Sequence, residues 1–190
     1  MEQKLAKLQT KLKEIKNIES ATAILGWDQQ VLMPPGGGEA RAEQIATLDK
    51  IGHELFVADE IGELLEDLSK AGFAYDSDEA SLIRVVQRDY EKARKLSTEL
   101  VTEMSRTFTL GQDIWTKARA EKDFAQFEET LSQIVDLNIQ KAEAYGYDDS
   151  IYDALLDDFE PNLKTAEVNQ VFDDLKETLI PFVQQITENQ

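Results

Sequence analysis

The chain breaks its helical pattern once, sharply, in the stretch ILGWDQQVLMPPGGGEARAEQ, residues 24–44. Two prolines and three glycines occupy residues 34–38. Proline lacks an amide donor and restricts the residue before it, so a helix cannot continue through this segment. Trp27 and Asp28 precede the break, and Glu39 and Arg41 follow it. The stretch therefore predicts a tight corner between two long helices.

Apolar residues recur at three- and four-residue spacing on both sides of this corner, which is typical of amphipathic helices. The first predicted helix covers about residues 3–30 and the second runs from Glu39 to about Phe56. The inward positions expected for these two helices are Leu5, Leu8, Leu12, Ile15, Ile18, Ala42, Ile45, Leu48, Ile51 and Leu55.

Capping residues and helix breakers divide the remaining chain into further helices. We expect starts at Asp59, at Ser77, at Ser97 and at Asp123, and the helix from Asp123 should end at Tyr145-Gly146. A short helix opens at Asp149 or Ser150, and the last begins at Thr165. The face predicted for the helix after Ser77 is Leu82, Val85, Val86 and Tyr90, and that of the last helix is Val168, Val171, Phe172, Leu175, Leu179, Phe182 and Ile186.

These patterns predict an all-α fold, a multi-helix array of about seven or eight helices in one region, residues 1–190. No convincing alternation of β-branched residues is present, and no repeat of fixed period. Hydrophobic residues make up 42% of the 190, enough for a packed core.

The bulk composition excludes several classes of function. The formal net charge of −18 repels phosphate backbones and anionic headgroups, so we expect no nucleic-acid or membrane partner. No run of about 18 apolar residues could span a membrane, and the first residues do not form a secretory signal. Cysteine is absent, which excludes disulfides and thiolate metal sites and suits the cytoplasm, the compartment that we expect.

His53 is the only histidine in the sequence. A helical zinc-protease motif, H-E-x-x-H, needs a second histidine four residues on, where this chain has Val57. A di-metal carboxylate site needs a glutamate three residues earlier, where it has Lys50. No serine is paired in the sequence with a histidine or lysine base. We therefore predict no catalytic and no metal-binding residue here, and interpret His53 as a partly exposed helical residue.

Three other features have structural interpretations that we favour over functional ones. Glycines 36–38 lack the Lys-Ser/Thr that follows a phosphate loop. The acidic clusters at residues 148–149 and 157–160 lack the alternating ligands and the glycine of a calcium loop. Trp27 and Trp115 are expected in the core, although Trp27, one turn before the corner, has the better case for a ligand-binding role.

Three segments, in family order, resemble the carboxypeptidase Taq family of metal-dependent carboxypeptidases. The first is residues 21–48, with Trp27-Asp28-Gln29 and Met33-Pro34; the others are residues 115–127 and 142–161. One departure is Asn162, where the family usually has a glycine after the proline.

The resemblance implies an N-terminal portion of a larger helical metallopeptidase. Family members are considerably longer, and their H-E-x-x-H helix and further glutamate ligand lie beyond the matched segment. A divalent metal, zinc or cobalt, is thus implied for the full-length enzyme and none for this chain. The expected function is removal of C-terminal residues from peptides, with this segment forming a wall or lid of the substrate groove and inactive alone.

An alternative from another class remains open, a stand-alone acidic helical module that binds a protein partner. Both hypotheses predict exposed apolar surface. We expect homo-oligomers or self-association through such helix faces, with Phe172, Leu175, Leu179 and Phe182 among the residues involved.

Overall fold

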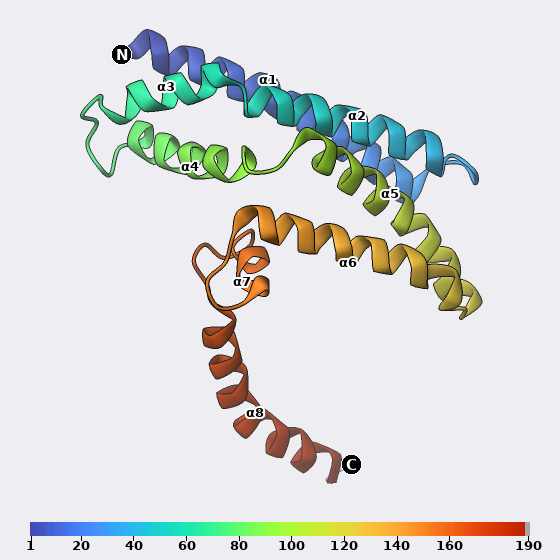
Figure 1. The fold of residues 1–190 in the computed structure, drawn as a ribbon. Helices are drawn as coiled ribbons and strands as arrows, with labels where there is room; N and C mark the ends of the chain where they lie inside the picture. The colour runs from blue at the N-terminus through green and yellow to red at the C-terminus, as the bar shows by residue number, and fades with distance from the viewer. Residues whose placement is uncertain (189–190) are drawn as a thin grey trace. The chain divides into compact units, whose positions relative to one another are not determined.

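A computed structural model describes residues 1–188, which contain eight α-helices and no strand, so the all-α prediction is confirmed. None of these helices combines the length and apolarity that crossing a membrane requires. The helices (Figure 1) are α1 (Glu2–Val31), α2 (Gly38–Phe56), α3 (Asp59–Ser69), α4 (Asp78–Ala93), α5 (Thr98–Glu121), α6 (Ala125–Tyr145), α7 (Ile151–Leu156) and α8 (Thr165–Glu188).

Helix starts follow the predicted caps with one correction. Ser77, Ser97 and Ser150 each accept a hydrogen bond from a backbone amide in the first turn of α4, α5 and α7. Asp59 is not a cap: Ala58 holds that position, and Asp59 is the first residue of α3, where its charge favours the helix dipole. The carboxylate of Asp123 accepts from the amide of Ala125, as its predicted capping role requires.

Contacts between residues divide the chain into two units, residues 1–137 and 138–190. The main core of the first unit lies between α1, α3 and α4. Its buried members are Leu8, Ile15, Ile61, Leu64, Leu65, Leu68, Ile83, Val86 and Tyr90.

The inward face of α4 differs from the prediction by one position. Ile83 is buried, whereas Val85 is 59% exposed. Val86 and Tyr90 are buried as expected. Ile83, Val86 and Tyr90 are spaced three and four residues apart and share one face of the helix, whereas Val85 lies about 100° around the helix from Val86.

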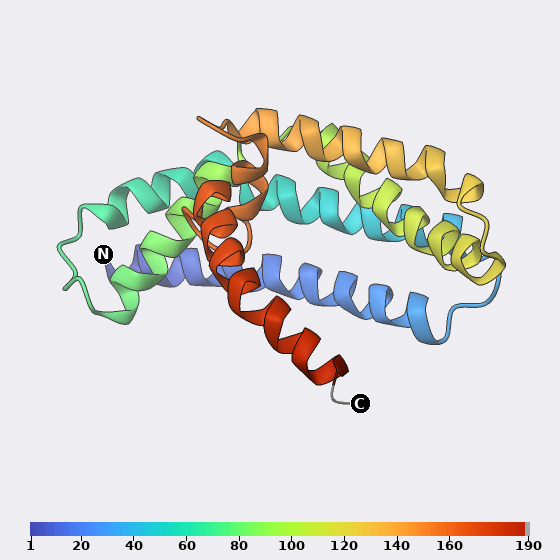
Figure 2. The same ribbon diagram turned by 90° about the horizontal axis from the view of Figure 1, so that it is seen from below.

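Small residues bring α2 close to its neighbours in the first unit. α2 lies beside α1 (Figure 2) and packs along α5. Ala42, Ala46 and Gly52 are buried on α2, and a Cβ on Gly52 would lie 3.8 Å from Cγ2 of Ile18 on α1. Side chains as small as these allow two helix backbones to approach closely, so α2 packs against both α1 and α5.

Lysines of α1 pair with acids of α3 along the outer edge of the core. The Lys4 ammonium lies 2.5 Å from Asp67, and Lys7 and Lys11 both contact Glu60. These partners hold the pKa values of the Asp67 and Glu60 carboxyls below their usual range. The pairs are solvent-exposed, so they orient α1 on α3 and add little stability.

The second unit contains the end of α6 together with α7 and α8. Ala142 and Ala154 are buried there, and α8 contacts α7. The Asp153 side chain, 6% exposed, accepts hydrogen bonds from the Thr165 amide at 2.7 Å and its hydroxyl at 2.5 Å. This carboxylate fixes the first turn of α8. Within residues 165–188 no residue is buried.

Candidate functional site

The predicted corner joins α1 to α2 through residues 32–37. The α1 helix ends where the amides of Leu32 and Met33 both bond the Asp28 carbonyl. The Gly37 amide then bonds the Pro34 carbonyl at 3.0 Å and closes a tight turn. The interpretation of this stretch as a structural corner is confirmed.

Each glycine of the corner is required for a different reason. Gly36 has a φ of +90°, a conformation that side chains rarely adopt. A Cβ on Gly37 would lie 2.9 Å from Met33 Cγ. A Cβ on Gly38 would lie 2.2 Å from Oδ2 of Asp113 on α5. The run of three glycines therefore reflects backbone geometry and close packing.

The acid and the base that flank the corner meet across it. Nη2 of Arg41 donates to Oδ2 of Asp28 at 2.5 Å, and Nη1 donates to the carbonyl of Leu25, also at 2.5 Å. The Arg41 side chain is only 12% exposed. One guanidinium thus binds both a side chain and the backbone of the last α1 turns.

A second set of hydrogen bonds ties α1 to α5. The Gln29 amide donates to Oδ1 of Asp113 at 2.9 Å and to the carbonyl of Thr109 at 3.0 Å. Asp28 and Gln29 are adjacent in the sequence, but Asp28 is hydrogen-bonded to α2 and Gln29 to α5. A hollow of about 530 Å³ adjoins them, lined by Gln29, Gln30, Met33, Pro34, Pro35, Gly36, Gln112, Asp113, Thr116, Lys117 and Ala120.

The expectation that both tryptophans pack in the core is wrong. Trp27 is 60% exposed and Trp115 is 38% exposed. Trp115 lies under the guanidinium of Arg119, 5.2 Å from its ring centroid. Ile24 and Val31 are also exposed and lie on the same side of α1 as Trp27. The last turns of α1 therefore present an apolar surface.

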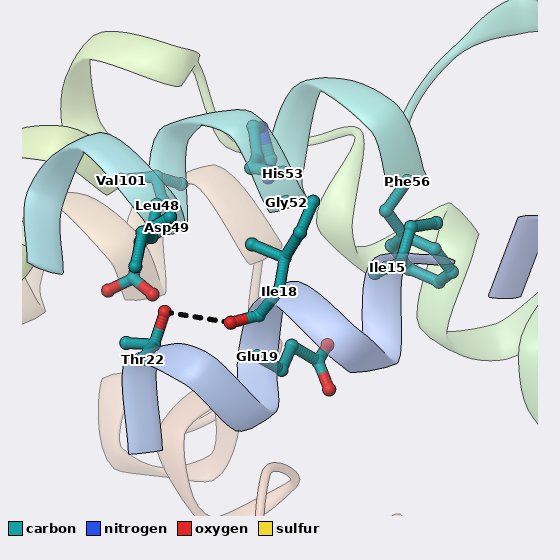
Figure 3. Close-up of a pocket in the computed structure, with 10 residues that line it drawn as sticks. All are labelled: Ile15, Ile18, Glu19, Thr22, Leu48, Asp49, Gly52, His53, Phe56 and Val101. Carbon is teal, nitrogen blue, oxygen red and sulfur yellow. Dashed lines mark hydrogen bonds between the residues drawn. The ribbon is translucent and has the colours of Figure 1, made fainter. Parts of the chain in front are cut away.

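His53 lies at a second hollow, of about 260 Å³, between α1 and α2 (Figure 3). Its Nε2 is 3.1 Å from the Leu96 carbonyl, and the side chain is half-buried, as predicted. Asp49 accepts a hydrogen bond from the Ser105 hydroxyl at 2.6 Å, and Thr22 donates to the Ile18 carbonyl. The lining residues are Ile15, Ile18, Glu19, Thr22, Leu48, Asp49, Gly52, His53, Phe56 and Val101.

The polar side chains of this second hollow have partners within the chain. The Ser105 hydroxyl donates to the Asp49 carboxylate, and the His53 ring lies within hydrogen-bond distance of the Leu96 carbonyl. Among residues 1–188 no group of three or more potential ligand side chains could hold a metal. The Asp49–Ser105 hydrogen bond connects α2 with α5, His53 contacts the segment before α5, and the Thr22 bond lies within α1.

The acidic cluster at residues 157–160 has a structural role in the second unit. Lys141 lies 2.6 Å from Asp158, and Asp157 accepts from the Asn162 amide at 2.8 Å. Burial and the neighbouring Asp158 and Asp157 charges raise the pKa of the Tyr145 hydroxyl. The two carboxylates therefore hold the segment between α7 and α8 in place within the second unit.

Asn162 shows why a residue other than glycine is accepted after Pro161. Its φ is +68°, in the left-handed region. Asparagine adopts this region more readily than other side chains, so the turn keeps its shape without glycine.

Comparison with known proteins identifies the family. A sequence model described as Carboxypeptidase Taq (M32) metallopeptidase matches residues 7–190. Thermostable carboxypeptidase 1 of Pyrococcus furiosus is 35% identical over 178 residues, which are 94% of this chain and 36% of that protein. Carboxypeptidase 1 of Bacillus subtilis is 30% identical over 176 residues, 93% of this chain and 35% of that protein.

Solved structures share the fold. A crystal structure named BsuCP has a TM-score of 0.92 at 28% identity and matches 97% of this chain and 37% of its own. The Pyrococcus furiosus carboxypeptidase structure has a TM-score of 0.79 at 33% identity, over 98% of this chain and 37% of its own. This chain spans little more than a third of the length of the proteins that it matches. It belongs to the carboxypeptidase Taq (M32) family of metallopeptidases.

Proposed function

We propose that this chain is the N-terminal part of a metal-dependent carboxypeptidase, which removes C-terminal amino acids from peptides. The observation that carries the proposal is the family match over residues 7–190. The matched relatives are named carboxypeptidases, and they are almost three times as long as the matched segment.

The metal of such an enzyme is expected on residues outside this chain. The described residues include no ligand cluster, and the only histidine contacts the Leu96 carbonyl. A divalent metal, zinc or cobalt, would polarise the attacking water and the scissile carbonyl. We accordingly propose that the chain is inactive alone, and that the whole enzyme acts on peptides in the cytoplasm.

The role proposed for this segment is a wall or lid of the substrate groove. Two features support it. The corner is held by the Asp28–Arg41 and Gln29–Asp113 hydrogen bonds, which give it a defined position. Beside it, Ile24, Trp27 and Val31 expose an apolar surface of the kind that marks binding grooves and interfaces.

The test is a peptidase assay of the purified chain. Peptides with a free C-terminus, and the same peptides amidated, are incubated with the chain and zinc or cobalt, with the Pyrococcus furiosus relative as positive control. We expect no release of amino acids by this chain. Metal-dependent release from the peptides with a free C-terminus, and not from the amidated peptides, would show that the chain is active. That result would contradict the proposal that the chain is inactive alone.

The alternative, a stand-alone interaction module, is favoured by one observation, the exposed apolar residues of α8. The two proposals differ in what the gene encodes. If a stop codon naturally follows Gln190 and no H-E-x-x-H is encoded nearby, the interaction module becomes the better account.

A further inference from the structure

The second hollow, between α1 and α2, combines apolar walls with four polar side chains. The polar side chains are those of Glu19, Thr22, Asp49 and His53, and every lining residue belongs to the first unit. What these four groups can offer to a ligand depends on which of their hydrogens and lone pairs the protein already uses.

The hydrogens of Thr22 and His53 are bonded within the protein. The Thr22 hydroxyl donates to the Ile18 carbonyl at 3.2 Å, so its oxygen is left with lone pairs (Figure 3). A carbonyl oxygen only accepts, so Nε2 of His53, 3.1 Å from the Leu96 carbonyl, carries the ring hydrogen. Nδ1 of the neutral ring is then an acceptor. Neither side chain has a hydrogen left for a ligand.

Each of the two carboxylates has one oxygen already bonded. Oδ2 of Asp49 accepts from the Ser105 hydroxyl at 2.6 Å, and Oε2 of Glu19 accepts from the Lys16 ammonium at 2.9 Å. Oδ1 of Asp49 and Oε1 of Glu19 accept no hydrogen bond from the part of the chain that the structure describes. Figure 3 shows the Asp49 carboxylate turned across the hollow toward α1.

A ligand that satisfies this lining has to supply hydrogens and positive charge. A primary ammonium group has three single donors and no acceptor, which matches one free oxygen on each carboxylate. A guanidinium binds best to both oxygens of one carboxylate, and neither Asp49 nor Glu19 has both free. The formal net charge of −18 also attracts cations to the chain.

The walls and the volume of the hollow suit a short alkyl chain. Ile15, Ile18 and Phe56 are among the apolar residues that line it. Its volume of about 260 Å³ lies below the range of about 300–1,000 Å³ that is usual for drug-sized ligands. The ligand is therefore small, with an apolar stem and one charged end.

We propose that the second hollow binds a primary alkylammonium group, carried by a small amine or by the side chain of a lysine. The ammonium bonds the free oxygens of Asp49 and Glu19, and its alkyl chain lies against the apolar wall. This site goes beyond the proposed peptidase function and does not depend on it.

The first experiment titrates the ¹⁵N-labelled 190-residue chain with n-butylammonium and follows the amide signals of Gly52 and His53 by NMR. Saturable shifts should give a dissociation constant on the order of 1–10 mM. Butyltrimethylammonium keeps the charge without an N–H donor, and 1-butanol keeps the chain without the charge. Both should bind at least about tenfold more weakly. No saturable shift with butylammonium, or equal binding of butyltrimethylammonium, would overturn the proposal.

The second experiment removes single carboxylates. Asp49→Asn should raise the dissociation constant for butylammonium at least about tenfold, and the more exposed Glu19→Gln about threefold. Glu14→Gln is the matched control, because it removes an exposed carboxylate of α1 that does not line the hollow, and it should change binding less than about twofold. Circular dichroism checks that the variants keep their helix content. Equal effects of all three substitutions would contradict the site.

The third experiment separates the two sources of the ammonium with Nα-acetyl-lysine methylamide, which carries the group on a peptide-like backbone. If it shifts the same amide signals as butylammonium, the hollow accepts the lysine side chain of a peptide. If only butylammonium does so, the site is one for small amines. Failure of both probes to bind would overturn the proposal.

Discussion

Arg41 reaches back across the corner to Asp28, and its guanidinium lies 2.5 Å from that carboxylate. The same side chain binds the Leu25 carbonyl, so the start of α2 is fixed to the last turns of α1. A planar guanidinium can satisfy both acceptors at once, whereas an ammonium group on a lysine cannot reach both in that geometry.

Arg41→Lys should therefore lower the free energy of unfolding by about 1–2 kcal/mol, since one hydrogen bond to a charged group or a backbone carbonyl is lost. Urea unfolding followed by circular dichroism measures it. Arg106→Lys is the matched control, because Arg106 pairs with Glu43 at the exposed surface and should change the midpoint little. Equal losses in both variants would contradict a special role for Arg41.

Gly38→Ala should destabilise the chain by about 1–3 kcal/mol, because its Cβ would overlap the Asp113 carboxylate. Gly26→Ala is the control: nothing lies within 4 Å of a Cβ there, and alanine should stabilise α1 by about 0.5–1 kcal/mol. In an Asp113→Ala background the cost of Gly38→Ala should shrink, as a double-mutant cycle would show. Simple additivity would mean that the two residues do not interact.

Acid should release the start of α8. Hydrogen bonds from Thr165, with the nearby Lys164 charge, hold the pKa of Asp153 below its ordinary value of 3.8. A lowered pKa contributes stability that is fully present above the unfolded value and is lost as pH falls through the folded value. The difference in unfolding free energy between the unsubstituted chain and Asp153→Asn should therefore be constant near neutral pH. It should shrink as the pH falls below about 4.

The matched control for this titration is Asp148→Asn, which removes an exposed carboxylate. The difference in unfolding free energy between Asp148→Asn and the unsubstituted chain should stay small across the same pH range. A gap for Asp153→Asn that does not change on acidification would show that the carboxylate contributes nothing through its charge.

Asn162→Gly should stabilise the second unit by about 0.5–1 kcal/mol, because glycine adopts a φ of +68° without steric cost. Asn162→Ala should destabilise it by a similar amount. The Asn162 amide that bonds Asp157 is unchanged in both variants. Thermal unfolding compares the three, and an order other than Gly, Asn, Ala would contradict the conformational explanation.

Helix positions were predictable because the signals are local. Ser77, Ser97 and Ser150 bond amides within three residues, and prolines 34 and 35 end α1 whatever surrounds them. The corner was also recognisable, since its glycines and its acid–base pair lie within fourteen residues of one another.

Partners distant in sequence were not predictable. The contact of Gln29 with Asp113 spans 84 residues, and nothing in the sequence near Gly38 indicates that an α5 carboxylate fills the space of its side chain. The prediction that Trp27 and Val85 face the core was wrong for a related reason. Periodicity identifies apolar positions on a helix but not which of them meet a neighbouring helix.

The central claim, that this chain is the N-terminal part of an M32 carboxypeptidase, is tested most directly in a chimaera. Residues 7–190 replace the matching segment of Bacillus subtilis carboxypeptidase 1, and the release of C-terminal amino acids is measured with and without a metal chelator. The account predicts metal-dependent release by the chimaera and none by the 190-residue chain. A chimaera that folds and binds metal but releases no amino acids would contradict it.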